Sequence, residues 1–556
     1  MGGGLMQLVA YGAQDVYLTG NPQITFFKVV YRRHTNFSVE CIEQTFNGTA
    51  DFGRTVTCNI SRNGDLVTKM YLKVELEATS EIGNTDAEKA AKAYSLCQNL
   101  GRVLVESAKV EIGGSKIDEH YGDWLNIWGE LSRNNSLDRG TDKMLGNVPE
   151  LRSYTKSKKR YTMYVPMQFW FCRNNGLALP LIALQYHDVR ITFKFRDAAE
   201  CVSMKAGESR SDIKFKDAIL LIDYIYLDSE ERKRFAQASH EYLIEQLQFT
   251  GEESVNTAQE KFRLNFNHPC KALFWSLRLG NYTTGKSSIA LADNGEVDIE
   301  RFAKVMWMAT RVDAGGAKYN NNATYDLAAT NTAEDEIQAP NKAAVGTDAA
   351  KNDISQAVSD IVDGIKAQFV VADGSAAAPL SLDNVVVLSH DLTASDLSTA
   401  YDTLVAGVSN AEAKKVLSAH ARTLRQHTNH GLYVDGTENP VLNAKLQLNG
   451  HDRFSEQDGH YFNYVQPYQH FSNTPNDGNN VYSFALNPEE HQPSGTCNMS
   501  RIDNATLSLK LGERNAETSR NFQDEYLVDD TVCSIYTVNY NVLRIMSGMG
   551  GLAYSN

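Results

Sequence analysis

The sequence is poor in the features that mark secreted, membrane-spanning or zinc-binding proteins. Its 556 residues include only 12 prolines and 8 cysteines, and no apolar run approaches the ~20 residues that span a bilayer. The first basic side chain is Lys28, so the charged start of a secretory signal is missing. The cysteines are scattered, with no C-x-x-C pair and no histidine at zinc-ligand spacing. We therefore expect a soluble protein whose thiols stay reduced and mostly buried in a cytosolic setting.

Positive charge is also scarce. The chain has 54 Lys and Arg against 68 Asp and Glu, a formal net charge of −14, which disfavours a broad phosphate-binding surface. The dense basic cluster at 156–160 is predicted to be a solvated loop, with a contact to an anionic membrane or a nucleic acid as the alternative.

Aromatic residues are abundant, and the strongest local pattern is alternation of apolar and polar side chains. The alternation predicts antiparallel strands with one solvated face. It runs through four stretches, at 66–76, 189–195, 262–266 and 507–511. Helical spacing is the minority pattern: Trp124, Trp128 and Leu131 share one face, and Asp228 opens a short charged helix.

A modest internal repeat relates the two halves of the chain. Residues 109–114 (KVEIGG) resemble residues 445–450 (KLQLNG). In each half an aromatic strand and an alternating strand follow at the same interval, and a strongly apolar strand closes the half. These strands begin near Tyr164, Val189 and Leu220 in the first half and near Tyr482, Leu507 and Val532 in the second. The repeat predicts two β-domains of one plan, either sandwiches or jelly rolls.

Residues from about 287 to 435 differ in composition from the rest of the chain. They are rich in Ala, Asp and Asn and poor in aromatics, and they carry helical spacing. A composition change inside a β-rich chain indicates an inserted subdomain or a large surface excursion.

A short motif at 280–287 (GNYTTGKS) matches the P-loop pattern G-x-x-x-x-G-K-S. Its phosphate-binding residues would be Gly280, Gly285, Lys286 and Ser287. A true P-loop joins a buried parallel strand to a helix, whereas the strand before Gly280 alternates and no long amphipathic helix follows Ser287. Candidate metal-holding aspartates, Asp223 and Asp391, are poorly placed. We interpret the match as a chance one.

No catalytic or metal-binding constellation is readable. His427 and His430 lie three residues apart, with His420 seven residues before His427, but no acidic or cysteine partner stands at matching spacing. We therefore expect no cofactor, no metal and no enzymatic activity. Among the N-x-S/T sequons, Asn281 and Asn322 are the candidate glycosylation sites.

Several long stretches resemble the major capsid proteins of nucleocytoplasmic large DNA viruses, the algal and giant virus type. The matching stretches run through both halves of the chain, at 10–22, 26–37, 60–66, 176–186, 240–251, 263–269, 448–454, 492–496, 500–507 and 539–554. Residues 287–435 match nothing recognisable.

The resemblance implies an all-β protein of two consecutive eight-stranded antiparallel jelly rolls, with a mixed or helical insertion in the second. The expected divisions are an N-terminal segment 1–25, a first jelly roll 26–236, a second jelly roll 237–286 and 436–556, and an outward tower loop 287–435. The expected role is a homotrimeric, pseudo-hexagonal capsomer that tiles an icosahedral shell.

Other partners and locations also come with this resemblance. They are neighbouring capsomers, minor capsid proteins, an inner viral membrane, and host-surface glycans through the insertion, but not the genome directly. The protein would be assembled in the host cytoplasm and reside in the virion. Two alternative functions stay open, a glycan-binding jelly roll and a nucleotide-binding protein that uses 280–287.

Overall fold

The fold is given by a computed structural model of the whole chain. It describes residues 3–24, 26, 33–77, 94–133, 135–152, 159–204, 213–280, 427–432, 438–512 and 531–554. The predicted P-loop residues after Gly280 and nearly all of the predicted insertion lie outside these ranges.

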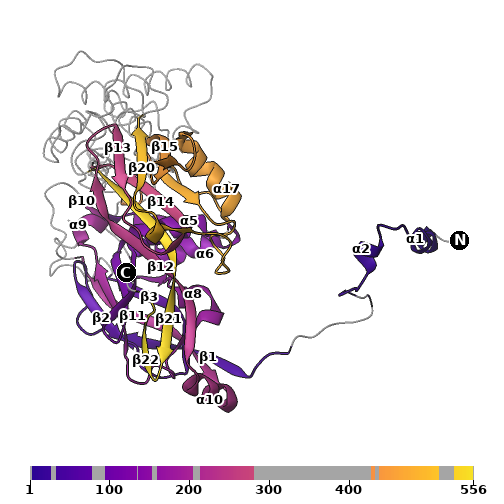
Figure 1. Cartoon of the computed structure of the whole chain (residues 1–556). Helices are drawn as coiled ribbons and strands as arrows, with labels where there is room; N and C mark the ends of the chain where they lie inside the picture. The colour runs from indigo at the N-terminus through magenta and orange to yellow at the C-terminus, as the bar shows by residue number, and fades with distance from the viewer. Residues whose placement is uncertain are drawn as a thin grey trace, which may run out of the picture.

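The first half of the chain forms a sandwich of two antiparallel sheets (Figure 1). One sheet has the strand order β1-β11-β3-β7, and the other has the order β2-β9-β5-β6. The strands are β1 (Phe37–Thr45), β2 (Thr55–Asn59), β3 (Leu66–Leu76), β5 (Val105–Ile112), β6 (Ser115–Tyr121), β7 (Tyr161–Pro166), β9 (Val189–Phe195) and β11 (Phe215–Leu227).

The second half repeats this arrangement strand for strand. Its sheets have the orders β12-β21-β14-β18 and β13-β20-β15-β16. The strands are β12 (His240–Ser254), β13 (Gln259–Arg263), β14 (Pro269–Arg278), β15 (Val441–Leu448), β16 (His451–Asp452), β18 (Asn479–Ser483), β20 (Ala505–Leu511) and β21 (Val532–Met546). Both halves therefore have the jelly-roll plan, and the segment between β14 and β15 corresponds to the segment between β3 and β5.

Short elements fill the connections. The helices are α1 (Gly3–Val9), α2 (Val16–Thr19), α4 (Leu100–Val103), α5 (Gly122–Leu131), α6 (Asp138–Leu145), α7 (Pro149–Arg152), α8 (Trp170–Arg173), α9 (Ala198–Cys201), α10 (Ser229–Gln237) and α17 (Gln466–His470), with the helical turns η2 (Asn135–Leu137), η3 (Asn175–Leu177), η7 (Tyr461–Val465) and η8 (Met499–Arg501). The minor strands are β4 (Tyr94–Leu96), β8 (Leu179–Pro180), β10 (Val202–Met204), β17 (Gln457–Asp458), β19 (Cys497–Asn498) and β22 (Met549–Leu552).

The alternating sequence patterns give the strands that they predict. In β9, and in β3 from Met70 onward, buried residues point into the first core while the residues between them are partly or fully exposed. The repeated sequences at 109–114 and 445–450 end the equivalent strands β5 and β15, so the predicted repeat is confirmed. One prediction needs correction: β13 ends at Arg263, and Leu264 and Phe266 are buried beyond the strand.

Helix α5 confirms the predicted helical face and is fixed at its start by close backbone contact. All ten of its residues are buried. A methyl group added at Gly122 would lie 2.2 Å from the carbonyl oxygen of Val105 and 2.8 Å from that of Arg102. Only glycine therefore lets the helix begin this close to the preceding chain.

Replacing Gly122 by Ala should destabilise the fold. Because the new methyl group meets backbone rather than a movable side chain, we expect a loss of about 1–3 kcal/mol in the free energy of unfolding. The matched control is Gly140→Ala in α6, where an added methyl group meets nothing within 4 Å. That substitution should stabilise slightly, because alanine favours helix by up to ~1 kcal/mol over glycine. Urea unfolding of both variants measures the difference, and equal effects would contradict the prediction.

Candidate functional site: the junction between the two sandwiches

Aromatic side chains of α5 join the two sandwiches. The ring of Trp124 lies 4.9 Å from that of Phe274 on β14 and 5.8 Å from that of Tyr536 on β21, between centroids. Trp128 packs beside them, 6.4 Å from Phe471. These residues form a core cluster of their own, separate from the cores of the two sandwiches. The outer face of the second sandwich is thus covered by a helix of the first.

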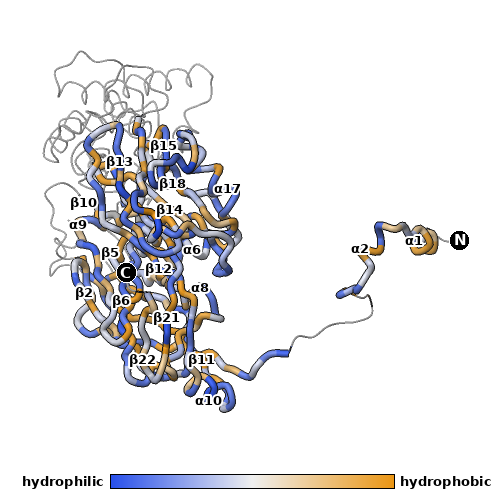
Figure 2. The backbone as a smooth tube through the Cα atoms, in the orientation of Figure 1, coloured by the Kyte–Doolittle hydropathy of each residue, from blue (hydrophilic) through white to orange (hydrophobic). Residues whose placement is uncertain are grey.

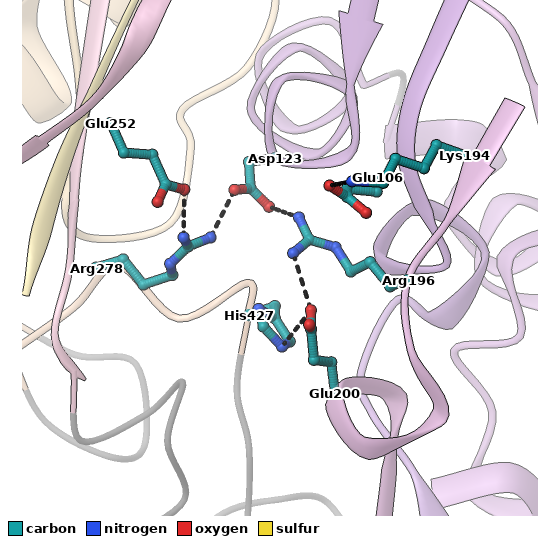
Figure 3. Close-up of polar contacts among 8 residues, drawn as sticks. All are labelled: Glu106, Asp123, Lys194, Arg196, Glu200, Glu252, Arg278 and His427. Atoms are coloured by element: carbon teal, nitrogen blue, oxygen red, sulfur yellow. Dashed lines mark hydrogen bonds and ion pairs between the residues drawn. The ribbon is translucent and has the colours of Figure 1, made fainter. Parts of the chain in front are cut away.

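A buried carboxylate, Asp123, lies next to this aromatic cluster and binds two arginines (Figure 3). One carboxylate oxygen accepts from Arg196 of the first sandwich at 2.9 Å, and the other accepts from Arg278 of the second at 2.7 Å. Each arginine also binds an outer carboxylate, Glu200 for Arg196 and Glu252 for Arg278. A continuous chain of ion pairs therefore crosses the junction.

The charges around Asp123 fix its protonation. Burial alone would raise the pKa of this carboxyl group, but Arg196 and Arg278 outweigh burial and lower the pKa to about 2. The carboxylate is therefore ionised at neutral pH, and its two arginines remain charged beside it. A charge cluster of this kind stabilises the junction only while every member is present.

A second ionic cluster has its central carboxylate on the other sandwich. Glu245 of β12 binds Lys271 at 2.8 Å and Arg173 of the first sandwich at 2.9 Å, and His491 lies 3.3 Å away. Burial opposes ionisation of Glu245, but Arg173, His491 and Lys271 lower its pKa to about 2. Asp123 and Glu245 are thus reciprocal: each belongs to one sandwich and binds a cation of the other.

A polar cavity of about 490 Å³ lies beside the Glu245 cluster. Its walls come from both sandwiches and carry charges of both signs. The lining residues are Lys69, Trp170, Arg173, Asn174, Asn175, Leu177, Glu245, Glu489, Glu490 and His491. Among these groups, Glu245 pairs with Arg173 and His491, and Glu489 accepts a hydrogen bond from the Ser472 backbone N–H at 2.9 Å.

A third buried carboxylate, Glu130 at the end of α5, is held by amides instead of cations. It accepts hydrogen bonds from the side chains of Asn126, Asn476 and Asn479, each at 2.9 Å, and from the backbone N–H of Asn476 at 3.1 Å. Burial raises its pKa in spite of these bonds. The amides come from both sandwiches, so this group also joins them.

These arrangements are suited to holding two sandwiches together. The carboxylates accept from cations and amides that belong to the fold, which leaves no free general acid or base among them. Among the described residues no group of three His, Cys, Asp or Glu could hold a metal ion, and no helix is long and apolar enough to cross a membrane.

The structure places Gly280 two residues after the end of β14, where its N–H donates to the Thr531 hydroxyl at 3.1 Å. Strand β14 is antiparallel to both neighbours, β21 and β18, so it is not the parallel strand that a P-loop needs. Gly285, Lys286, Ser287, Asn281 and Asn322 lie outside the described residues. The glycosylation candidates and the chance-match interpretation stay predictions.

His427, His430 and Arg160 of the basic cluster contact other residues of the fold. His427 lies 3.6 Å from Glu200 in the chain of ion pairs, and buried His430 contacts the Leu277 carbonyl oxygen through Nδ1 at 3.1 Å. His420 and Lys156–Lys158 lie outside the described residues. Arg160, at the end of the basic cluster, pairs with Glu75 at 3.2 Å.

Sequence reasoning missed Asp123, Glu245 and their cations. One signal was available: Lys271 stands inside the apolar run CKALFW of β14, and a charge within a buried strand needs a partner. Nothing in the sequence identified Glu245, 26 residues earlier, as that partner.

Comparison with known proteins matches the whole chain to viral capsid proteins. Residues 25–228 match the family described as major capsid protein N-terminus, and residues 231–551 match the large eukaryotic DNA virus major capsid protein family. Capsid protein 1 of Acanthamoeba polyphaga mimivirus is 44% identical over 606 aligned residues, and the major capsid protein of Phaeocystis pouchetii virus is 44% identical over 594. Both alignments cover 100% of each chain.

Solved structures show the same fold. The crystal structure of PBCV-1 VP54, fitted into a reconstruction of the virophage Sputnik, has a TM-score of 0.62 and 31% identity. The match covers 96% of this chain and 100% of that one. The Faustovirus major capsid protein shares the fold, with a TM-score of 0.55 at 12% identity, over 96% of this chain and 94% of that one.

Replacing Asp123 by Asn should weaken the junction strongly. The change leaves two buried guanidinium groups without their carboxylate, and such a loss costs about 3–5 kcal/mol. The control is Glu106→Gln, which removes a solvent-exposed ion pair with Lys194 and should cost under ~1 kcal/mol. Chemical unfolding measures both variants. A loss for Asp123→Asn no larger than that for Glu106→Gln would contradict the role assigned to Asp123.

The low pKa of Glu245 predicts where acid destabilises the protein. A carboxyl group whose pKa is lowered by folding stabilises the fold above its unfolded value, 4.5 for Glu, and this stabilisation is lost as the pH falls to the folded value of about 2. The urea midpoint should therefore fall across this window, and less steeply in Glu245→Gln. Equal slopes in the variant and the wild type would contradict the assignment.

Proposed function

The chain belongs to the family of large eukaryotic DNA virus major capsid proteins, and we propose that three copies of it form one pseudo-hexagonal capsomer. As a structural capsid protein of the virion, it assembles with neighbouring capsid subunits into capsomers and a shell. The observation that supports a trimer is the repeated strand order of the two sandwiches. Two similar sandwiches in each of three chains present six similar sides, which suits a hexagonal lattice.

The junction inside the chain offers a template for the contact between chains. Strand β12 of the second sandwich lies along β6 of the first: the Leu247 N–H donates to Asp118 at 3.1 Å, and the Gln246 amide donates to the Ile117 carbonyl oxygen. Ile244 of β12 is buried in the core of the first sandwich. Helix α5, which follows β6, covers the outer face of β14 and β21.

The surface of the first sandwich that is equivalent to β12, and the segment of the second sandwich that is equivalent to α5, are both exposed. Strand β1, which corresponds to β12, exposes 53% of Phe37 and 55% of Val39. The turn η7 and helix α17, which follow β16 and β17 as α5 follows β6, expose 40% of Val465 and 85% of Tyr468. The first sandwich therefore exposes a surface like the one that α5 covers, and the second sandwich exposes a segment like α5.

We propose that these two exposed surfaces contact each other in neighbouring copies of the chain. The η7–α17 segment of one copy would cover the outer face of β1, β11 and β3 in the next copy, as α5 covers β14 and β21 within a chain. Such a head-to-tail contact uses two different surfaces, and it forms a closed ring when the rotation that it imposes completes a circle. Six sandwiches in the ring correspond to three chains.

Sedimentation should give a particle of three 61.8 kDa chains, about 185 kDa. Tyr468→Glu places a charge in the proposed contact, so we expect it to shift the particle towards monomer by at least ~10-fold in dissociation constant. The control is Tyr186→Glu, at a side chain that is 76% exposed on the loop before β9. A wild-type monomer, or equal effects of the two variants, would count against the proposed contact.

The N-terminal segment offers a different surface, which we assign to a minor capsid protein. Residues 3–24 stand clear of the sandwiches (Figure 1), and many of them are apolar, as the hydropathy colours of Figure 2 show. Tyr17 and Leu18 are 91% and 82% exposed. An anionic membrane surface is the less favoured partner, because no basic residue precedes Lys28 and lipid headgroups are recognised mainly through Lys and Arg.

Deleting residues 3–19 should leave the trimer intact and remove binding to minor capsid proteins. Sedimentation tests the first expectation, and co-purification with minor capsid proteins co-expressed from the same virus tests the second. Flotation with anionic and neutral vesicles tests whether residues 3–19 bind a membrane surface instead of a minor capsid protein. Unchanged co-purification, or a strong vesicle association lost on deletion, would contradict the assignment.

Three further expectations stay proposals. Host-surface glycans would bind through residues 287–435, assembly would take place in the host cytoplasm, and the acidic protein would leave genome contact to others. A glycan array with and without residues 287–435 tests the first. The antiparallel setting of β14 disfavours the nucleotide-binding alternative.

A further inference from the structure

Two free thiols lie opposite each other on a small sheet at the side of the first core. Cys97 follows β4 and Cys201 precedes β10, and the two strands pair antiparallel with Leu96 opposite Val202. The next pair in this register is Cys97 and Cys201, where the Cys97 N–H donates to the Cys201 carbonyl oxygen at 3.0 Å. Both side chains are buried in the core of the first sandwich.

This placement suits a disulfide bond. Residues that face each other in a hydrogen-bonded antiparallel pair have Cα atoms about 5.5 Å apart, within the range of about 4.4–6.8 Å that disulfides span. Both side chains belong to the first core, so both point to the same side of the small sheet. No large movement of the backbone is needed to join them.

We propose that Cys97 and Cys201 are a latent disulfide, which closes when the shell leaves a reducing cell for an oxidising medium. A low-molecular-weight disulfide is the oxidant. One cysteine, as thiolate, attacks it and releases one small thiol, and the second cysteine displaces the other small thiol from the mixed disulfide. Two cysteine thiols and one small disulfide thus give the Cys97–Cys201 bond and two small thiols, with two electrons passing to the oxidant.

The disulfide would hold in place Glu200, the member of the ion-pair chain that contacts His427. Cys201 is the last residue of helix α9. Glu200, the residue before it in the same helix, binds Arg196 at 3.3 Å and lies 3.6 Å from His427. Arg196 in turn binds Asp123 at the junction. Joining α9 to β4 would therefore hold Glu200 in position, and Figure 3 shows Glu200 in contact with both Arg196 and His427.

Burial keeps the reaction slow. Cys201 is fully buried and Cys97 is 6% exposed, and the hydrogen bond from Cys97 together with burial raises the pKa of Cys201 well above its usual value. The thiolate is the attacking species, so a raised pKa lowers the rate. Strands β4 and β10 pair over only three residues each, so local opening gives the oxidant access more easily than opening of the main sheets would.

The test is mass mapping of the full chain after incubation with oxidised glutathione in about 1 M urea, which favours local opening without global unfolding. We expect a peptide pair that joins Cys97 to Cys201, with a mass about 2 Da below that of the two thiols. Exposed Cys41 should carry a glutathione adduct, which shows that the oxidant acted. Cys97→Ser and Cys201→Ser should each lack the joined pair.

A thermal scan adds a second readout, which measures stability instead of mass. Closing a loop of about 100 residues should raise the melting temperature of the oxidised wild type by at least ~3 °C over the reduced form, with no rise in either variant. The proposal would be overturned if Cys41 carries the adduct but Cys97 and Cys201 are not joined to each other. They could then be still reduced, separately glutathionylated or joined to other cysteines. The biological setting of the disulfide rests on the proposed function. The cross-link itself is measured on the purified chain, so its absence would not affect the sedimentation test of the trimer.

Discussion

The rest of the molecule depends on how one carboxylate, Asp123, is shared between two sandwiches. Arg196 approaches it from the first and Arg278 from the second. The aromatic contact of Trp124 with Phe274 excludes water beside it, which strengthens the ion pairs but makes the loss of any partner costly. Glu245 repeats the arrangement with the roles of the sandwiches exchanged. Two such groups, one from each side, hold a defined orientation, which hydrophobic contact alone does not specify.

A fixed orientation is what a shell protein needs from a chain with two similar halves. The strand orders of the halves are the same, yet their environments differ: Ile244 on β12 is buried at the junction, while Phe37 and Val39 on the equivalent strand β1 are exposed. A second copy that covers β1 would give the first sandwich the environment that the second already has. On this view the assembly repeats, between chains, a contact already present within each chain.

Much of this fold could be predicted because it depends on local pattern. Alternation identified β3 and β9, helical spacing identified α5, and the repeat at 109–114 and 445–450 identified equivalent strands. The junction could not be predicted, because its partners are distant in sequence: Asp123 and Arg278 are 155 positions apart, and Arg173 and Glu245 belong to different sandwiches. The P-loop match at Gly280 shows the opposite failure. Its residue pattern is complete, but β14 before it is antiparallel to both neighbours.

The most direct test of the account is an electron cryomicroscopy structure of the assembled oligomer. We predict that α17 of one copy lies on the outer face of β1, β11 and β3 of the next, with the same relative rotation that places α5 on β14 and β21 within a chain. An oligomer in which α17 and the β1 face are both left exposed to solvent, or in which neighbouring chains are related by a different rotation, would contradict the claim that one junction is used twice.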